Sequence, residues 1–305
     1  MKRITANGGM RVKDFSIKHT FESAQPLTFH ADYNEREGTL SYVNYDSLIR
    51  ARFSDGAAAC RISVDPENST KIERELASRF RLGDNMDRIY QNISTDSFME
   101  SAIRQYRGMR ITLNDPWETT LCFILSQYNN VKRIRLIVQR FIAEFGPEIR
   151  DGDGIAIAKG FPTSERLTEY SEAEFRKAGA GFRARYVANA ADFCTNNLNL
   201  HKLRGKRYPD LKEALMEISG VGDKVADCIA LMGYGSMEAF PIDVWVKRTL
   251  EQLYFNSREK SVKELHRFAE ERWGDYMGYA QQYLFHSSRD NNLTVIESNS
   301  IGASG

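Results

Sequence analysis

Three side chains that could do chemistry fall within one short stretch, "SGVGDKVADCIALMGYGSMEAFPIDVWVKR", between Ser219 and Arg248. The first is Lys224, in the first turn of a predicted apolar helix, where the positive end of the helix dipole disfavours a second positive charge. Partial burial and that dipole would both shift an amine toward its neutral, nucleophilic form. The position therefore nominates Lys224 as a nucleophile, although an isolated lysine of this kind commonly extends to solvent along its stem.

A thiol and a carboxylate accompany the amine. Cys228 follows Lys224 at i+4, hence on the same helix face, although a buried helical cysteine most often serves packing alone. Asp243 precedes "VWVKRTL" and is a good helix N-cap. A carboxylate held by helix N–H groups stays ionised and fixed, which suits it to stabilise positive charge that develops on a sugar ring.

The glycines before Lys224 predict how this set is positioned. "LKEALMEI" and "DKVADCIALMGY" have helical patterns, and "SGVG" between them is a tight turn. In such a layout the backbone N–H groups around Gly220, Val221 and Gly222 can hold a phosphate oxygen without reading sequence. A plain turn between two helices is the alternative for the glycine pattern alone. With the amine and the carboxylate, the stretch predicts attack on a sugar carbon beside a nucleic-acid backbone.

The rest of the chain divides into a strand-rich and a helical part. "DFSIKHTF", "PLTFHADY", "TLSYVNY" and "AACRISV", between Val12 and Val64, predict antiparallel strands. From about Ser69 the hydrophobic period is helical. We therefore predict an α+β, mainly α fold, with a strand-rich domain and trailing helices over 1–105, a helical body over 106–287 and a mobile tail over 288–305. Helix N-caps are predicted at Asp115, Ser171, Asp243 and Ser261.

Composition limits the class of protein. The chain has 305 residues, with 42 Lys and Arg against 41 Asp and Glu, so a nucleic-acid partner would need a local basic patch. Four scattered cysteines indicate a reducing compartment and argue against a cysteine-ligated metal. No stretch resembles a signal peptide or a membrane span. We expect an intracellular protein without a membrane partner, in the cytoplasm or nucleoid of a prokaryote or the nucleus of a eukaryote. The candidate basic patch comprises Arg176, Lys177, Arg183, Arg185, Lys202, Arg204, Lys206 and Arg207.

The stretch "SGVGDKVADCIAL", followed by "AFPIDVWVKR", resembles the helix-hairpin-helix signature of base-excision DNA glycosylases and, more narrowly, that of the 8-oxoguanine DNA glycosylase/AP lyase family. "QYRGMRITLNDPWETTLCFILSQYNNVKRI", "GFPTSERLTEYSEAEFRKAGAGFRARYVANAA" and "GYAQQYLF" resemble the same family in order and spacing. The resemblance extends from about Leu82 to Ser287 and, more loosely, over the strands before it.

This resemblance implies roles around the damaged base. Lys224 would attack the anomeric carbon, expel the oxidised base and remain as a Schiff base, while Asp243 would support the sugar cation. Cys228 and Phe285 would sandwich the flipped base, and Gln281 would read its Watson–Crick edge. Without the resemblance, a phenylalanine in such a helix is usually core and a glutamine usually solvated. No metal or organic cofactor is expected, and the predicted partner is damaged double-stranded DNA, bound by a monomer.

The resemblance also implies contacts to the duplex. Phe182 would wedge into the stack, and Arg133 and Arg183 would bond the cytosine left behind. Asn129 and Asn130 match an asparagine-rich turn near the lesion.

Four positions depart from the family pattern. Tyr128 begins the asparagine run, which predicts relaxed discrimination for the opposite base. Ser219 replaces a proline in the hairpin, and Trp245 stands where a histidine is common. Ala24 occupies the position of a glycine whose carbonyl contacts the oxidised base, and its methyl group would restrict that approach.

The sequence thus predicts a bifunctional glycosylase/AP lyase for 8-oxoguanine. Two alternatives remain open: a monofunctional glycosylase for another damaged base, which would use Asp243 to activate water, and a non-catalytic module that binds damaged DNA.

Overall fold

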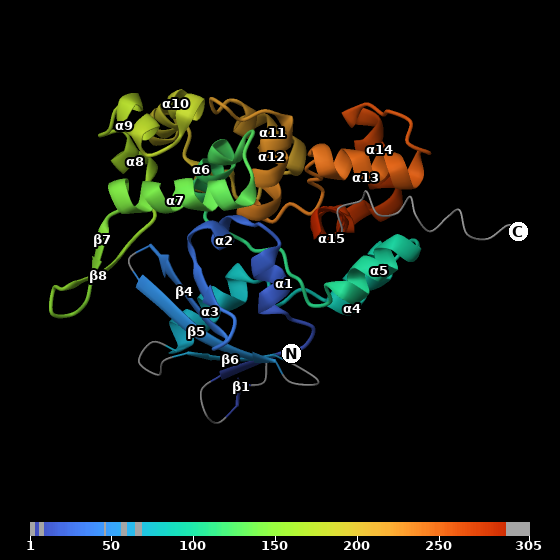
Figure 1. Cartoon of the computed structure of the whole chain (residues 1–305), viewed down its shortest axis with the longest axis horizontal. Helices are drawn as coiled ribbons and strands as arrows, with labels where there is room; N and C mark the ends of the chain where they lie inside the picture. Colours follow the sequence, from blue (N-terminus) through green and yellow to red (C-terminus); the bar gives the residue numbers. More distant parts are fainter. Residues whose placement is uncertain (1–3, 6–8, 46, 56–59, 65–68, 291–305) are drawn as a thin grey trace, which may run out of the picture. The chain divides into compact units, whose positions relative to one another are not determined.

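The computed structural model describes residues 4–5, 9–45, 47–55, 60–64 and 69–290. The chain forms two compact units (Figure 1). The first unit comprises Met1–Asp84 and Gly108–Ser236, and the second comprises Asn85–Arg107 and Met237–Gly305. Each unit is thus assembled from two separate stretches of chain and not from one consecutive segment.

The first unit contains an antiparallel sheet of six strands in the order β1-β2-β6-β5-β4-β3. Its buried face carries alternate apolar residues such as Leu40, Phe53 and Ile62, which pack against Leu76 and Phe80. This period of two confirms the predicted antiparallel sheet. The strands are β1 (Ile4–Thr5), β2 (Gly9–Val12), β3 (Asp32–Asn34), β4 (Thr39–Asn44), β5 (Ser47–Asp55) and β6 (Cys60–Val64).

Two predicted strands are wrong. "DFSIKHTF" contains helix α1 (Ile17–Glu22), and "PLTFHADY" forms helix α2 (Pro26–His30) before it enters β3. Ser16 caps α1 by accepting a hydrogen bond from His19 N at 3.3 Å, and Pro26 occupies the first turn of α2. The β-branched and aromatic residues of these segments favoured strands. Both segments form helices because each begins with a residue suited to a helix start and because each helix buries apolar side chains.

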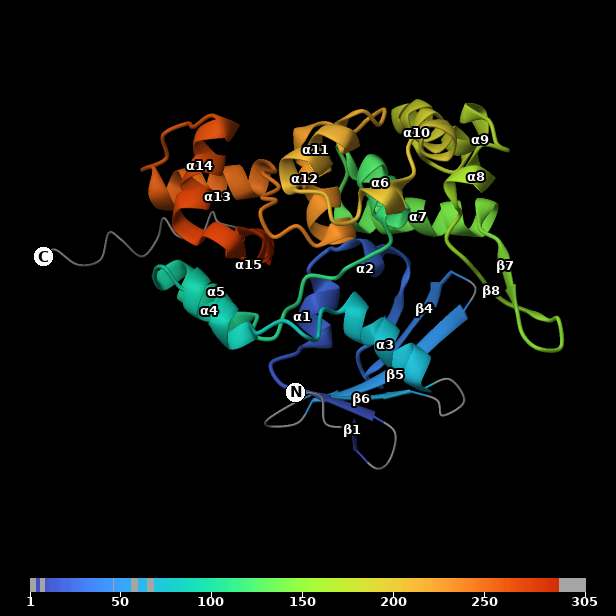
Figure 2. The ribbon, with the colours of Figure 1, turned by 180° about the vertical axis from the view of Figure 1, so that it is seen from behind.

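The other helices of the first unit confirm the predicted helical body (Figures 1 and 2). Helix α6 (Pro116–Ser126) is buried from Pro116 to Leu125, and a small hairpin of β7 (Glu148–Arg150) and β8 (Ala156–Lys159) follows α7 (Val131–Phe145). The remaining elements are α3 (Ser69–Arg79), α8 (Ser164–Leu167), α9 (Glu172–Lys177), η2 (Gly181–Arg183), α10 (Ala184–Asn196), η3 (Leu200–Leu203), α11 (Tyr208–Met216), α12 (Asp223–Ile229) and η4 (Ala230–Tyr234).

The second unit is helical. Its core includes the buried Tyr279 and Tyr283 of α15 and a stacked pair, Phe240 and Trp273, with ring centroids 5.8 Å apart. Helix α15 reaches Asp290, so 288–290 of the predicted tail are helical, and 291–305 lie outside the described residues. The elements are α4 (Met86–Ile93), α5 (Ser97–Gln105), α13 (Val244–Tyr254), α14 (Val262–Trp273), η5 (Gly274–Tyr276) and α15 (Met277–Asp290).

The four predicted N-caps are confirmed. Asp115 accepts from Trp117 N at 2.9 Å, Asp243 accepts from Val246 N at 2.8 Å, and Ser171 and Ser261 each form a capping box. Within the described part of the chain, no helix is long and apolar enough to cross a bilayer.

Candidate active site

Helices α11 and α12 form the predicted helix–turn–helix around the glycines. Gly220 has φ of +84°, and a Cβ there would lie 2.8 Å from Cβ and Cγ of Tyr186, so both conformation and space require glycine. Val221 N donates to Ile218 O at 2.9 Å and closes the turn. Gly222 then caps α12 in an extended conformation. Because the first N–H groups of a helix have no acceptor inside it, the start of α12 is suited to an anion such as a phosphate.

Lys224 extends over an aromatic ring. It is partly buried in the first turn of α12, and its Nζ lies 5.4 Å from the ring centroid of Phe123. An ammonium over an aromatic face is attracted by the ring, which here restricts where the amine can point. Cys228, one turn later, is 4% exposed. The lysine thus has a fixed aromatic support of the kind that positions a reactive group.

Sequence reasoning missed Phe123. It belongs to α6, which is buried over ten consecutive residues, Pro116 to Leu125, so no polar face singles out one side chain. The only available signal is its place three residues before Ser126, within the segment "LCFILSQY" that carries the family resemblance.

The buried side chain of Gln25 fixes the loop of Ala24 by hydrogen bonds. Gln25 Nε2 donates to Ser23 Oγ and to Arg110 O, both at 2.7 Å, and Gln25 Oε1 accepts from Thr112 N at 2.6 Å. Ala24 itself has φ of 59°, in the left-handed region that favours glycine. The chain therefore keeps a glycine-type backbone at this position while it carries a methyl group.

The turn between α6 and α7 is tied to the hairpin and to η2. Gln127 Nε2 donates to Gly220 O at 2.9 Å. Arg183 Nε donates to Gln127 O at 2.7 Å, and its Nη2 donates to Tyr128 O at 3.2 Å. Three segments far apart in the sequence, which include the hairpin, are thereby joined through backbone carbonyls.

Two aromatic rings project from this joined surface. Tyr128 is 93% exposed with φ of 49°, and Phe182 is 52% exposed. Their ring centroids are 6.1 Å apart in an edge-on arrangement. Exposed aromatics on a rigid support are the type of side chain that stacks on or inserts between bases.

Arg183 and its neighbours have structural roles that the resemblance did not indicate. Arg183 is 5% exposed, and its guanidinium donates to backbone carbonyls, including Ala180 O at 3.2 Å. Burial, and next to it the charge of Arg133, lowers the pKa of Arg183. Asn130 caps α7 by accepting from Arg133 N at 3.0 Å, and Asn129 Nδ2 donates to Leu125 O at 3.1 Å. Arg133 is exposed.

The second unit places three of the predicted residues. Asp243 is the N-cap of α13, so its carboxylate is fixed as predicted. Gln281 is 4% exposed, and its Nε2 donates to Pro241 O at 3.1 Å, which links α15 to the loop that enters α13. Gln281 Oε1 is buried without a hydrogen-bond partner among the described residues. Such an orphaned acceptor is costly unless a ligand satisfies it.

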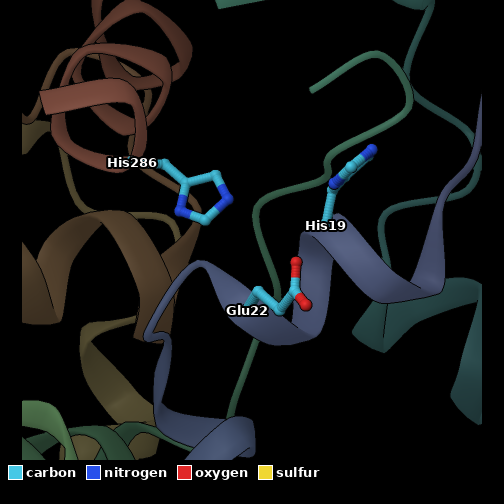
Figure 3. A group of neighbouring side chains, drawn as sticks. All are labelled: His19, Glu22 and His286. Carbon is cyan, nitrogen blue, oxygen red and sulfur yellow. The ribbon is translucent and has the colours of Figure 1, made fainter. Parts of the chain in front are cut away.

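Phe285 lies one turn further along α15. It is partly buried, and the Arg289 guanidinium lies 5.5 Å from its ring centroid. The next residue, His286, is buried in the same helix (Figure 3). Of the candidate residues, the first unit therefore holds Lys224, Cys228, Ala24, the turn and the hairpin, and the second holds Asp243, Gln281 and Phe285.

The chain has an antiparallel sheet followed in sequence by a helix-hairpin-helix whose second helix carries a lysine in its first turn. This combination defines a class of DNA-repair protein. A family model described as "HhH-GPD superfamily base excision DNA repair protein" matches residues 121–275, and one described as "8-oxoguanine DNA glycosylase, N-terminal domain" matches residues 9–120. The chain belongs to the 8-oxoguanine DNA glycosylase/AP lyase family of this superfamily, as its residues predicted, and is therefore an N-glycosylase and AP lyase by class.

Relatives agree with this assignment. The chain is 32% identical over 255 residues to an N-glycosylase/DNA lyase of Saccharomyces cerevisiae, which covers 72% of this chain and 68% of the relative. The structure of MBOgg1 in complex with a low-affinity DNA ligand superposes with a TM-score of 0.85 at 33% identity, over 96% of this chain and 99% of that one. The Clostridium acetobutylicum 8-oxoguanine glycosylase/lyase, in complex with DNA containing cytosine opposite 8-oxoG, gives a TM-score of 0.83 at 28% identity, over 96% and 98% of the chains.

Proposed function

We propose that this protein excises 8-oxoguanine from duplex DNA through a Schiff base on Lys224 and then nicks the strand by β-elimination, as one step of base excision repair. The observation that carries the proposal is the partly buried Lys224 at the start of α12, directly after the glycine turn and over the ring of Phe123. The complex of MBOgg1 with a DNA ligand supports DNA as the partner, and the complex of the C. acetobutylicum enzyme with double-stranded DNA supports a duplex.

The first step forms a bond from the Lys224 amine to the anomeric carbon while the bond from that carbon to the base breaks, and the base leaves with the electron pair and gains a proton. The resulting aminal opens when the bond to the ring oxygen breaks, which gives an imine. Asp243 is suited to stabilise the positive charge of this stage because its carboxylate is fixed as an N-cap.

The second step uses the imine as an electron sink. It makes the neighbouring sugar carbon acidic, so that carbon loses a proton and the 3'-phosphate leaves with the electron pair of its bond. Water then hydrolyses the imine and restores the lysine. Neither step requires a redox co-reactant.

The family resemblance assigns recognition of the base to Gln281, Phe285 and Ala24. The orphaned Gln281 Oε1 is a buried acceptor that a base edge could satisfy, and Phe285 offers a ring face in the same helix. Phe182 and Tyr128 would fill the space that the everted nucleotide leaves.

The test is borohydride trapping on duplexes with 8-oxoguanine opposite each normal base. We expect a covalent protein–DNA product from the unaltered chain and none from Lys224→Gln, which should still bind the duplex. Base release without trapping would instead indicate a monofunctional glycosylase. Unchanged strand cleavage by Lys224→Gln would refute the lysine mechanism, and binding without base release by the unaltered chain would indicate a non-catalytic module.

A further inference from the structure

The exposed face of the sheet in the first unit carries a row of arginines. Side chains alternate along β2, β6 and β5, and those that point away from the core include Arg11, Arg61, Arg52 and Arg50, all exposed. We call this set the sheet arginines. None of the four guanidinium groups has a hydrogen bond or ion pair with any described residue.

Their register makes this row dense in charge. Arg11 and Arg61 are directly opposite one another on β2 and β6, and Arg52 is diagonal to Arg61 because Arg61 pairs with Ser54. Strands are about 4.8 Å apart and alternate residues about 6.6 Å apart, so the row is roughly 10 Å wide. Like charges placed directly opposite in a sheet are unfavourable, which indicates that the arrangement serves an external anion.

A hollow adjoins two of the sheet arginines. It has a volume of about 450 Å³, and its lining includes Arg50, Arg52 and the hydroxyl residues Thr39, Ser41 and Ser63. Two acidic side chains lie nearby among the described residues: Asp32, on β3 opposite Ser41, and Glu37, whose carboxylate accepts from Thr39 Oγ1 at 3.4 Å. The surroundings are therefore cationic and hydroxyl-rich, in a chain whose net charge is only +1.

We propose that the sheet arginines bind the phosphate backbone of a DNA segment other than the one held at the glycine turn. Arginine, serine and threonine are the side chains that contact phosphates and sugars in a sequence-independent way, and among the described residues of this face the apolar side chains of Val43 and Leu48 are both partly buried. Helix α2 contacts α7 and also packs on the buried face of the sheet, so the arginines lie on the face of the sheet opposite to α2; Figures 1 and 2 show α2 between the sheet and α7. The sheet arginines and the glycine turn belong to separate elements of the first unit, so we assign them to separate segments of DNA.

A two-duplex capture experiment tests this inference independently of base excision. Lys224→Gln protein is bound to an immobilised undamaged duplex at about 50 mM salt, and capture of a second, fluorescent duplex is measured. We expect capture that is lost at about 200 mM salt and that falls at least fivefold in Lys224→Gln with Arg50→Gln and Arg52→Gln. Lys263→Gln with Arg267→Gln, which removes the same charge from exposed positions of α14, should leave capture unchanged.

The outcomes separate the possibilities. Equal capture by the Arg50→Gln/Arg52→Gln protein, equal loss in the α14 control, or no capture at low salt would overturn the inference. Preferential capture of a polyglutamate peptide over the duplex would also overturn it, in favour of an acidic protein partner. Arg11→Gln with Arg61→Gln serves as a second variant, expected to reduce capture with a thermal midpoint no lower than that of the parent. Excision by proteins that retain Lys224 should not change with any of these substitutions.

Discussion

Ala24 has a backbone conformation that favours glycine, although it carries a methyl group. Its φ of 59° costs an L-residue roughly 1 kcal/mol, and the buried bonds of Gln25 maintain the conformation. We predict that Ala24→Gly stabilises the protein by up to about 1 kcal/mol, less the entropy that glycine adds to the unfolded chain. Urea unfolding of the two proteins measures this, and a loss of more than about 0.5 kcal/mol in the variant would contradict it.

Tyr128 is the residue at which opposite-base preference can be tested. Its ring is 93% exposed beside Phe182, and a ring can stack on any base, whereas an amide can distinguish bases by hydrogen bonds. We predict that Tyr128→Asn increases the preference for cytosine opposite the lesion by roughly fivefold, the equivalent of one hydrogen bond of about 1 kcal/mol.

Single-turnover excision on four duplexes, each with a different base opposite 8-oxoguanine, measures the change. Phe182→Ala is the comparison, because it should slow excision on all four duplexes alike. A Tyr128→Asn protein with the unaltered pattern of preference would show that the ring does not set specificity.

The turn between α11 and α12 has two glycines with different requirements. A Cβ at Gly220 would meet Tyr186 at 2.8 Å and would have to adopt φ of +84°, whereas at Gly222 nothing lies within 4 Å and φ is −98°. We predict that Gly220→Ala destabilises the protein by about 2 kcal/mol and weakens DNA binding, while Gly222→Ala costs less than about 1 kcal/mol. Paired urea unfolding and DNA-binding titrations measure both effects, and equal effects of the two substitutions would contradict the assignment.

How far the sequence could predict each element depended on local signals. The N-caps at Asp115, Ser171, Asp243 and Ser261 were predictable because capping is a short-range interaction. Helices α1 and α2 were not, because their strand-like composition is overridden by caps and by packing. The support of Lys224 by Phe123, and of Tyr128 by Arg183, joins residues about 100 and 55 positions apart, which no periodicity encodes.

At the scale of the molecule, some candidate site residues belong to the first unit and some to the second, and the chain contributes two separate stretches to each unit. Residues 85–107 leave the first unit and return before α6, so the first unit contains both the sheet and the hairpin. The family resemblance gives the order of the motifs along the chain. It does not show that residues 85–107 pack with the second unit, because that depends on tertiary contacts. The interior of the first unit must therefore hold together parts of the chain that the sequence separates.

A buried ionic network joins α2, α3 and α6 in the first unit. Arg79 of α3 donates to both carboxylate oxygens of Glu118 of α6, at 3.2 and 3.3 Å, and His30 of α2 lies 2.9 Å from the same carboxylate. Arg79 and Glu118 are 4% and 5% exposed. Although burial alone would raise it, the charge of Arg79, with that of His30, lowers the pKa of Glu118 to about 2.

We predict that Glu118→Gln lowers the free energy of unfolding near pH 7 by about 3 kcal/mol, because it leaves the buried Arg79 charge paired with Glu75 alone, whose Oε1 accepts from Arg79 Nε at 3.1 Å. The folded-state pKa of Glu118 lies below the ordinary value of 4.5, so its contribution is fully present above that pH and is lost as the pH falls through about 2. The difference between the two proteins should therefore shrink between pH 4.5 and 2. Urea unfolding across this range tests the prediction, with the exposed Glu213→Gln as the matched control. A deficit that stays constant down to pH 2 would show that Glu118 acts by packing and not by charge.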